Sequence, residues 1–196
     1  MTSVHIDTGS SALLEVPLPK TRKNREFFEK CIDYVKDKLI HRPEIIVFNK
    51  VCHQNRWVGF FSDTSRGYKY SRKLMASQPL GDLLTRLLEM TNEIFGTSFN
   101  GILVNYYANG EENIGDHSDD EKGLHNGMVV SLSLGAERKF RIRDKTTKKI
   151  VKDVKTKNST YLVMLGDFQK EFTHGIPAEK KIAEGRYSFT FRSHSD

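Results

Sequence analysis

The sequence contains few cysteines and no long hydrophobic run. Two cysteines, Cys31 and Cys52, in 196 residues exclude a disulfide-dense secreted scaffold and favour a reducing compartment. No segment approaches the roughly 20 apolar residues of a membrane-spanning helix, and none resembles a secretory signal. We therefore expect an intracellular protein that does not bind membranes, and these features do not distinguish the nucleus from the cytoplasm.

The composition is that of a globular protein with an excess of positive charge. Hydrophobic residues make up 37% of the chain and charged residues 29%, which is enough to build one buried core. Lys and Arg number 31 against 25 Asp and Glu, so the net charge is +6. This balance favours a polyanionic partner such as nucleic acid without proving one, because many proteins are simply basic. No segment indicates a protein partner.

Periodicity predicts a flexible start followed by a helix and a strand. Residues 1–20 are aperiodic, and we expect a flexible N-terminal arm with one extended piece at Ala12–Val16. Residues 21–196 are predicted to form a single domain. Asn24 is a candidate cap for a helix with apolar residues at helical spacing that runs to about Ile40. Glu44–Val51 reads as one strand.

The next segment combines short aromatic strands with a second helix. Trp57–Phe61 and Gly67–Ser71 are separated by a polar turn and predict a hairpin-rich segment. A stripe of leucines predicts a helix that begins near Pro79 and ends at Gly96. This stripe is scaffold, because it is the face a helix buries on a sheet.

From Phe99 onward the chain reads as short strands and turns. The predicted strands are Gly101–Tyr107, Met128–Leu134, Lys139–Arg143, Thr160–Met164 and Gly185–Arg192. Two helices followed by many strands predict an α+β architecture with a sandwich or jelly-roll barrel, in which residues 21–98 hold the helices and hairpins and residues 99–196 the core. The lysine-rich segment 141–157 predicts a hairpin with a basic tip at 145–149.

A His-x-Asp pair, His117 and Asp119, lies in the run NYYANGEENIGDHSDDE. Residues two apart on an extended chain point to the same side, so an imidazole and a carboxylate can face one ion. His174, in EFTHGIP, is the leading third ligand, and two histidines with one carboxylate are the set used by non-haem Fe(II) oxygenases. Such a pair also arises by chance as a loop contact. His125 is the nearest competitor, but its glycine-flanked loop suits a flexible connection better.

The last strand, RYSFTFR, divides into a polar and an aromatic face. Arg186, Ser188, Thr190 and Arg192 share one face, which could simply lie in water. Two arginines at this spacing can instead hold the two ends of a small dicarboxylate. The Asn105 and Tyr107 pair has the same spacing. A metal triad with a dicarboxylate clamp is what an Fe(II)/2-oxoglutarate oxygenase requires.

These motifs resemble those of a known family. The runs NYY…GDHSDDE, VVSLSLGAERKFRIR, HGIP and RYSFTFR occur in the order and spacing of the AlkB family of Fe(II)/2-oxoglutarate-dependent dioxygenases. The resemblance extends from about Glu44 to Arg192 and is strongest to vertebrate members that repair duplex DNA. It implies a double-stranded β-helix (jelly-roll) core flanked by the two helices, with Fe(II), 2-oxoglutarate and dioxygen as cofactor and co-substrates.

The resemblance also implies residue roles at the catalytic centre. His117, Asp119 and His174 would bind iron. One carboxylate of 2-oxoglutarate would be held by Asn105 and Arg192, and the other by Tyr107 and Arg186. The remaining polar positions of the last strand, Ser188 and Thr190, would line the same site. Ser188 departs from the family, since many members have Asn there.

For nucleic acid, the resemblance implies a second set of residues. Val47 and Phe48 match a finger that wedges into the base stack. Tyr70 matches the aromatic that stacks on a flipped base, with Tyr68 beside it. Three further positions match side chains near the base or the nucleic acid, and they are Arg56, Asp120 and Glu121. The lysine-rich hairpin matches a basic loop on the DNA backbone, whereas the N-terminal partner-binding region of the duplex-repair members has no recognisable counterpart.

The function predicted from the sequence is oxidative demethylation of alkylated bases such as 1-methyladenine and 3-methylcytosine in DNA. The products would be formaldehyde, succinate and carbon dioxide. The same chemistry on RNA or protein is an alternative that fold and triad do not discriminate. A non-catalytic nucleic-acid-binding module is the other alternative, and the intact triad and both arginines argue against it.

Overall fold

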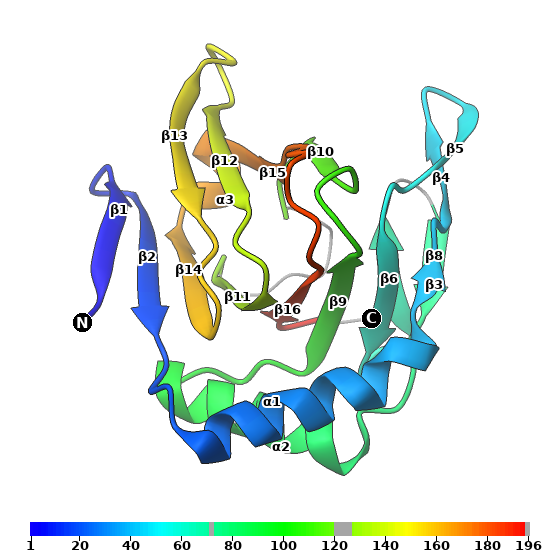
Figure 1. Ribbon diagram of the computed structural model, residues 1–196. Helices are drawn as coiled ribbons and strands as arrows, with labels where there is room; N and C mark the ends of the chain where they lie inside the picture. Colours follow the sequence, from blue (N-terminus) through cyan, green and yellow to red (C-terminus); the bar gives the residue numbers. More distant parts are fainter. Residues whose placement is uncertain (71–72, 120–126, 195–196) are drawn as a thin grey trace.

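The computed structural model describes residues 1–70, 73–119 and 127–194. A large sheet, a small sheet and two helices make up its layers (Figure 1). The large sheet has the strand order β1 (Ser3–Asp7), β2 (Ser11–Pro17), β14 (Thr160–Gly166), β11 (Val129–Gly135), β16 (Arg186–Arg192), β9 (Gly101–Tyr107), β6 (Trp57–Phe61) and β3 (Ile40–His41). The small sheet has the order β10 (Ile114–His117), β15 (Phe172–Ile176), β12 (Lys139–Asp144) and β13 (Ile150–Lys155). This confirms the predicted α+β class with a jelly-roll core.

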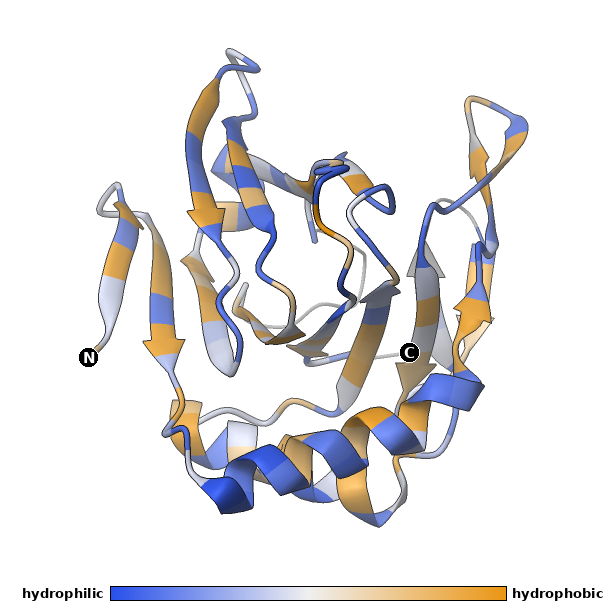
Figure 2. Ribbon diagram, viewed as in Figure 1, coloured by the Kyte–Doolittle hydropathy of each residue, from blue (hydrophilic) through white to orange (hydrophobic). Residues whose placement is uncertain are grey.

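The large sheet is buried on both faces, and each face has its own hydrophobic cluster. One cluster joins the helices to the outer face through residues such as Leu84, Val104 and Phe189. The other lies between the two sheets and includes Tyr107, Ile142 and Leu162. Alternation of hydrophobic and hydrophilic residues along the strands is visible in Figure 2. The side chains that point between the sheets therefore determine what the jelly roll can bind.

Both predicted helices are present, but the first begins and ends earlier than predicted, and Ile40 lies in strand β3. Helix α1 (Arg22–Val35) is capped by Thr21, whose Oγ1 accepts a hydrogen bond from the Asn24 amide at 3.1 Å, and is followed by the 3-10 turn η1 (Lys36–Lys38). Asn24 is therefore not the cap: it lies inside the first turn, and its own amide is one that Thr21 caps. Helix α2 (Gly81–Phe95) ends at Gly96 with φ of 61°, as predicted. No helix in the described residues is long and apolar enough to cross a membrane.

The prediction of a flexible N-terminal arm is wrong. Strands β1 and β2 form a hairpin, and β2 pairs with β14 from Ser11↔Gly166 to Pro17↔Thr160. The extended piece at Ala12–Val16 is thus a sheet strand, and Leu13 is fully buried in the cluster between the sheets. Its partner strand is about 150 residues away in the sequence, so local periodicity alone did not reveal the pairing.

The predicted single strand at 44–51 is a hairpin. Strands β4 (Glu44–Val47) and β5 (Lys50–His53) are joined by a two-residue turn at Phe48 and Asn49, with φ of 47° and 60°. Two positive φ values in a two-residue turn match the twist of the flanking strands. The hairpin projects at the upper right of Figure 1.

The aromatic segment after it splits between two sheets. Strand β6 coincides with the predicted strand at 57–61 and joins the large sheet beside β9. Strand β7 (Gly67–Tyr70) instead pairs with β8 (Lys73–Ala76) as a second projecting hairpin. The predicted basic hairpin is confirmed as β12 and β13, with its turn at 145–149.

Candidate active site

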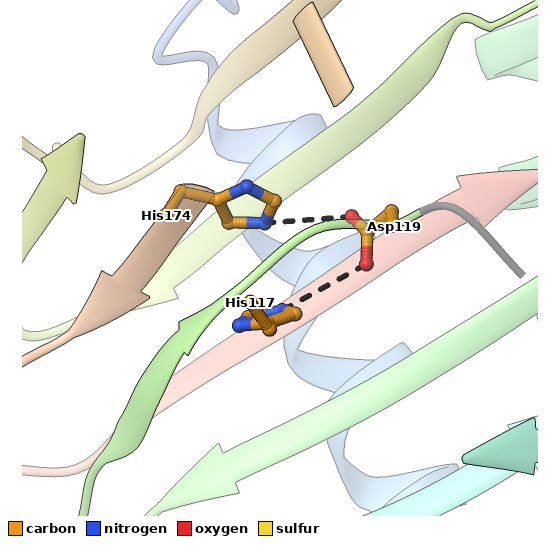
Figure 3. A group of neighbouring side chains, drawn as sticks. All are labelled: His117, Asp119 and His174. Carbon is orange, nitrogen blue, oxygen red and sulfur yellow. Dashed lines mark ion pairs between the residues drawn. The ribbon is translucent and has the colours of Figure 1, made fainter. Parts of the chain in front are cut away.

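The small sheet brings two histidines and one aspartate together. His117, at the end of β10, is paired in register with His174 on β15, and Asp119 follows two residues later. The Nε2 atoms of His117 and His174 lie 3.7 Å and 3.5 Å from the two carboxylate oxygens of Asp119 (Figure 3). The three ligand atoms lie within 4.8 Å of one another. Because metal–ligand bonds are about 2.0–2.2 Å, donors at these separations can surround one ion.

Neighbouring groups hold this triad in place. The Gly115 carbonyl oxygen lies 2.9 Å from His117 Nδ1, which directs Nε2 toward Asp119. The Asp119 amide donates to Gln169 Oε1 at 2.8 Å. The His174 ring stacks on Phe140, with ring centres 4.9 Å apart. Fixing each ligand through a second contact is how proteins orient metal ligands.

The electrostatics favour the protonation state that a metal needs. Burial and the neighbouring His174 lower the pKa of His117 to about 3, so its imidazole is neutral at physiological pH. Burial alone would raise the pKa of Asp119, but Arg192 and the two histidines hold it well below its usual range. Arg192 Nη2 donates to Asp119 Oδ1 at 2.7 Å. Neutral imidazoles and an ionised carboxylate are the forms that bind metals.

The triad lines a cavity, and the polar face of β16 forms another wall of it. Arg186, Ser188, Thr190 and Arg192 are 2%, 6%, 6% and 2% exposed, which excludes the alternative of a strand with this face in water. Cross-strand pairing with β9 sets Ser188 opposite Asn105 and Arg186 opposite Tyr107. The six residues therefore line one cavity together with the triad, as their spacing predicted.

Arg186 is a buried cation without a carboxylate partner among the described residues. Its Nη2 donates to Ser133 Oγ at 2.8 Å, and its guanidinium lies 5.6 Å from the centre of the Tyr107 ring. Its buried Nε has no hydrogen-bond partner in the described part of the chain. Burial, with a contribution from Arg138, lowers the pKa of Arg186 to about 10, so it remains charged at pH 7. A buried charge without a counterion is unfavourable by several kcal/mol. An anion in this cavity would remove that penalty, so the site around Arg186 suits a ligand with a carboxylate group.

Several residues that line the cavity or contact its side chains were not assigned from the sequence. Ser131 and Ser133 on β11 lie opposite Thr190 and Ser188 in register, and Ser131 Oγ lies 2.8 Å from Ser188 Oγ. The polar alternation of VVSLSLG carried this signal. Gln169, which contacts the Asp119 amide, comes from the short helix α3 (Phe168–Glu171) and had no such signal.

The residues expected to contact nucleic acid fall into different environments. Phe48 is 95% exposed at the tip of the β4–β5 hairpin. Arg56 is 4% exposed in the cavity wall, where its Nε donates to Asn105 Oδ1 at 2.7 Å. Tyr68 is also buried, and its hydroxyl accepts from Arg192 at 3.3 Å. Outside the described parts lie the side chains of Val47 and Tyr70 and the whole of Asp120, Glu121 and His125.

Comparisons with known proteins agree with this geometry. DNA oxidative demethylase ALKBH2 from Bos taurus is 28% identical over 173 residues, which are 84% of this chain and 61% of that protein. Alpha-ketoglutarate-dependent dioxygenase alkB homolog 3 from Homo sapiens is 35% identical over 136 residues, which are 64% of this chain and 48% of that protein. The chain thus spans less than two thirds of the bovine ALKBH2 length.

The fold and family comparisons complete the assignment. The solved structure of OsALKBH1 superimposes with a TM-score of 0.57 at 19% identity, over 91% of this chain and 97% of that chain, which supports the fold. The model of the 2OG-Fe(II) oxygenase superfamily matches residues 19–192. The predicted AlkB-like resemblance is therefore confirmed, and the chain belongs to the 2OG-Fe(II) oxygenase superfamily.

Proposed function

We propose that this protein is an Fe(II)- and 2-oxoglutarate-dependent dioxygenase that removes methyl groups from alkylated bases such as 1-methyladenine and 3-methylcytosine, with DNA as the substrate. The observation that carries the proposal is Arg186, a buried cation without a described carboxylate partner, in the same cavity as the His–Asp–His triad. A metal site alone would fit many activities. A metal site that also needs an anion fits 2-oxoglutarate.

Nine side chains share the binding of cofactor and co-substrate in this proposal. His117, Asp119 and His174 would hold Fe(II). Asn105 and Arg192 would hold one carboxylate of 2-oxoglutarate, and Tyr107 and Arg186 the other. Ser188 and Thr190 complete that wall with small side chains. Bound iron and 2-oxoglutarate would supply the oxidation of the N-methyl group by dioxygen, with succinate, carbon dioxide and formaldehyde as products.

The chain's own contribution is to position these groups and to exclude water. Arg192 contacts Asp119 at 2.7 Å, so one guanidinium would orient a proposed metal ligand and also face the co-substrate. Arg56 holds Asn105 Oδ1, which leaves the Asn105 amide nitrogen for the ligand. Arg56, Asn105, Asp119 and Arg192 are each less than 10% exposed. Fixed donors in a water-poor cavity need little reorganisation during the reaction.

A base in a duplex reaches such a cavity only by rotating out of the stack, which is unfavourable by a few kcal/mol. Phe48 supports a wedge for that step. It is 95% exposed and has φ of 47°, a backbone region that a bulky residue rarely adopts. Neither packing nor backbone preference explains a phenylalanine there, and such strain favours a functional role. An apolar wedge between bases is a known means of opening a stack.

The test is a turnover panel with the purified chain, Fe(II) and 2-oxoglutarate. Methylated single-stranded DNA, duplex DNA and RNA are supplied at equal concentration, and formaldehyde and succinate are both measured. We expect both products in equal amounts, with the highest rate on DNA. Faster turnover of RNA would reassign the substrate. Succinate without formaldehyde on all three would refute base demethylation while leaving the oxygenase chemistry intact.

A further inference from the structure

A second cavity lies between the two projecting hairpins, and nothing in the proposed reaction uses it. We call it the hairpin cavity. Its volume is about 480 Å³, within the roughly 300–1,000 Å³ typical of ligand sites. Its lining comes from the chain before β4, from β4, β6, β7 and β8, and includes Ile40, Pro43, Val58, Leu74 and Met75. The cavity is therefore mainly apolar and large enough for an aromatic ligand.

One polar atom in this lining has no partner. Gln54 is 6% exposed, lines the hairpin cavity, and its buried Oε1 atom accepts no hydrogen bond from the residues that the structure describes. A buried carbonyl oxygen without a donor is unfavourable, so its occurrence calls for an explanation. A ligand that is flat, apolar on its faces and able to donate an N–H would satisfy both Gln54 and the apolar walls. Nucleobases have this combination of properties.

The position and charge of the hairpin cavity point to nucleic acid as the source of that base. Tyr68 lines both the hairpin cavity and the cavity that holds the triad, so the two sites adjoin at this side chain. Residues 40–78 contain seven Lys or Arg against two Asp or Glu, a net charge of +5 within a chain of net charge +6. Lys38 and Lys73 lie in the lining itself, together with Glu44, which pairs with Lys73. A phosphate backbone would be attracted to this segment.

We propose that the hairpin cavity binds the nucleobase next to the methylated one on the same strand, with its N–H donated to Gln54 Oε1. This inference rests on the proposed function. The two cavities would then hold consecutive bases of an unstacked strand on either side of Tyr68. The protein would recognise its substrate through two bases, although only one of them reacts.

The experiment uses pentanucleotides with a central 1-methyladenine, in which the 5′ or the 3′ neighbour is replaced by an abasic residue. The wild-type chain is measured for kcat/KM by formaldehyde release and for Kd by fluorescence anisotropy. We expect one of the two abasic neighbours to lower kcat/KM roughly tenfold, the effect of losing one stacked base at the lower end of the measured range. The Gln54→Leu change should lower kcat/KM for the intact pentanucleotide about two- to tenfold, the effect of one lost hydrogen bond. It should lower kcat/KM less for the pentanucleotide with the abasic neighbour.

Two further variants keep the test independent of folding defects. Ala76→Phe places a ring in the hairpin cavity from β8. In this variant an abasic neighbour should lower kcat/KM less than it does in the wild type. Gln78→Leu is the matched control, because its Nε2 already donates to the Lys38 carbonyl at 3.0 Å, and it should keep the neighbour effect. If both pentanucleotides with an abasic neighbour are demethylated as fast as the intact one, this inference is overturned and the proposed function still stands. No formaldehyde from any substrate would refute the proposed function instead.

Discussion

The triad cavity and the two hairpins beside it are built in opposite ways. The cavity lies between sheets, and the polar side chains opposite the triad come from β9 and β16, which have partner strands on both sides. Asn105, Arg186 and Arg192 are each at most 7% exposed. The hairpins are two separate two-stranded sheets, β4–β5 and β7–β8, with Phe48 and Leu74 at 95% and 63% exposed. A two-stranded hairpin alone is only marginally stable in water.

This difference separates the two tasks of the proposed enzyme. Chemistry requires groups held to a fraction of an ångström, which a doubly buried strand provides. Recognition of an unstacked strand requires a surface that can adjust, and the hairpins carry the exposed apolar side chains for it. The sheet cavity should therefore be sensitive to single atoms, whereas the hairpins should affect substrate preference more than chemistry.

The largest effect is expected from Asp119→Ala. This change removes the carboxylate from the triad and leaves Arg192 without its partner at 2.7 Å. Turnover should fall by more than the roughly 10–100-fold that changes around a metal site cause. Anaerobic titration with Fe(II) and 2-oxoglutarate, followed by absorption spectroscopy, should show weaker metal binding independently of activity.

Asp116→Ala is the matched control for that loss. Asp116 is one residue before His117 on β10, but it is exposed and pairs with Arg143 at 2.6 Å on the surface. Removing an exposed ion pair changes little, so both iron binding and turnover should be retained. Equal losses in the two variants would mean that Asp119 acts only through the local fold.

The second effect concerns the unpaired cation. Arg186→Met should raise KM for 2-oxoglutarate roughly 10–100-fold, as for one or two hydrogen bonds to a charged group. The same variant should be as stable as the wild type or more stable without 2-oxoglutarate, because a buried charge without a counterion is removed. Thermal unfolding with and without 2-oxoglutarate measures both consequences.

Arg138→Met is the control for Arg186→Met, because Arg138 is a buried arginine whose hydrogen bonds are to the protein itself. Arg138 is 1% exposed and donates to the carbonyl oxygens of Asn109, Glu112 and Pro177 at 2.8–2.9 Å. Its loss leaves those carbonyls unsatisfied and should destabilise the fold by about 2–4 kcal/mol in urea unfolding. If Arg186→Met destabilised the apo protein equally, Arg186 would have a structural partner and the anion argument would fail.

Local spacing predicted the parts of the site that lie on one strand. The four polar residues of β16 alternate with aromatics, so strand geometry alone brought them to one side, and Asp119 follows two residues after His117 at the end of β10. That His174 faces His117 follows from the pairing of β10 with β15, across a separation of 57 residues. The sequence suggested His174 as a candidate, but only long-range pairing defines the register.

Two errors have the same origin. The N-terminal hairpin was read as a flexible arm because its pairing strand β14 is distant in sequence. The turn at Phe48 and Asn49 was missed because the residues favoured at positive φ are Gly, Asn and Asp, and a phenylalanine gives no turn signal. Both features depend on contacts or strain that local patterns do not encode.

A moderate effect, confined to duplex substrates, is expected from Phe48→Ala. If the exposed ring fills the gap left by a flipped base, its loss should lower duplex turnover by roughly 5–30-fold, which corresponds to one or two kcal/mol. Turnover of single strands should change less than about twofold. The free energy of unfolding should change by less than about 0.5 kcal/mol, because a side chain that is 95% exposed packs against little. Val51→Ala, at a 62% exposed position on the same hairpin, is the control. Equal losses on single strands and duplexes would contradict a wedge.

The smallest effect is expected where the hairpins are joined. Lys73 on β8 and Glu44 on β4 form an ion pair at 3.4 Å, with side chains 46% and 53% exposed. Such a pair contributes between 0 and about 1 kcal/mol, so Glu44→Gln should leave the unfolding free energy nearly unchanged. Removing the carboxylate frees Lys73 for phosphate, and the affinity for DNA should rise slightly at low salt and converge with the wild type at high salt. Anisotropy titrations across a salt series measure this. A large loss of stability would instead show that the hairpins depend on each other as strongly as the strands of the jelly roll do.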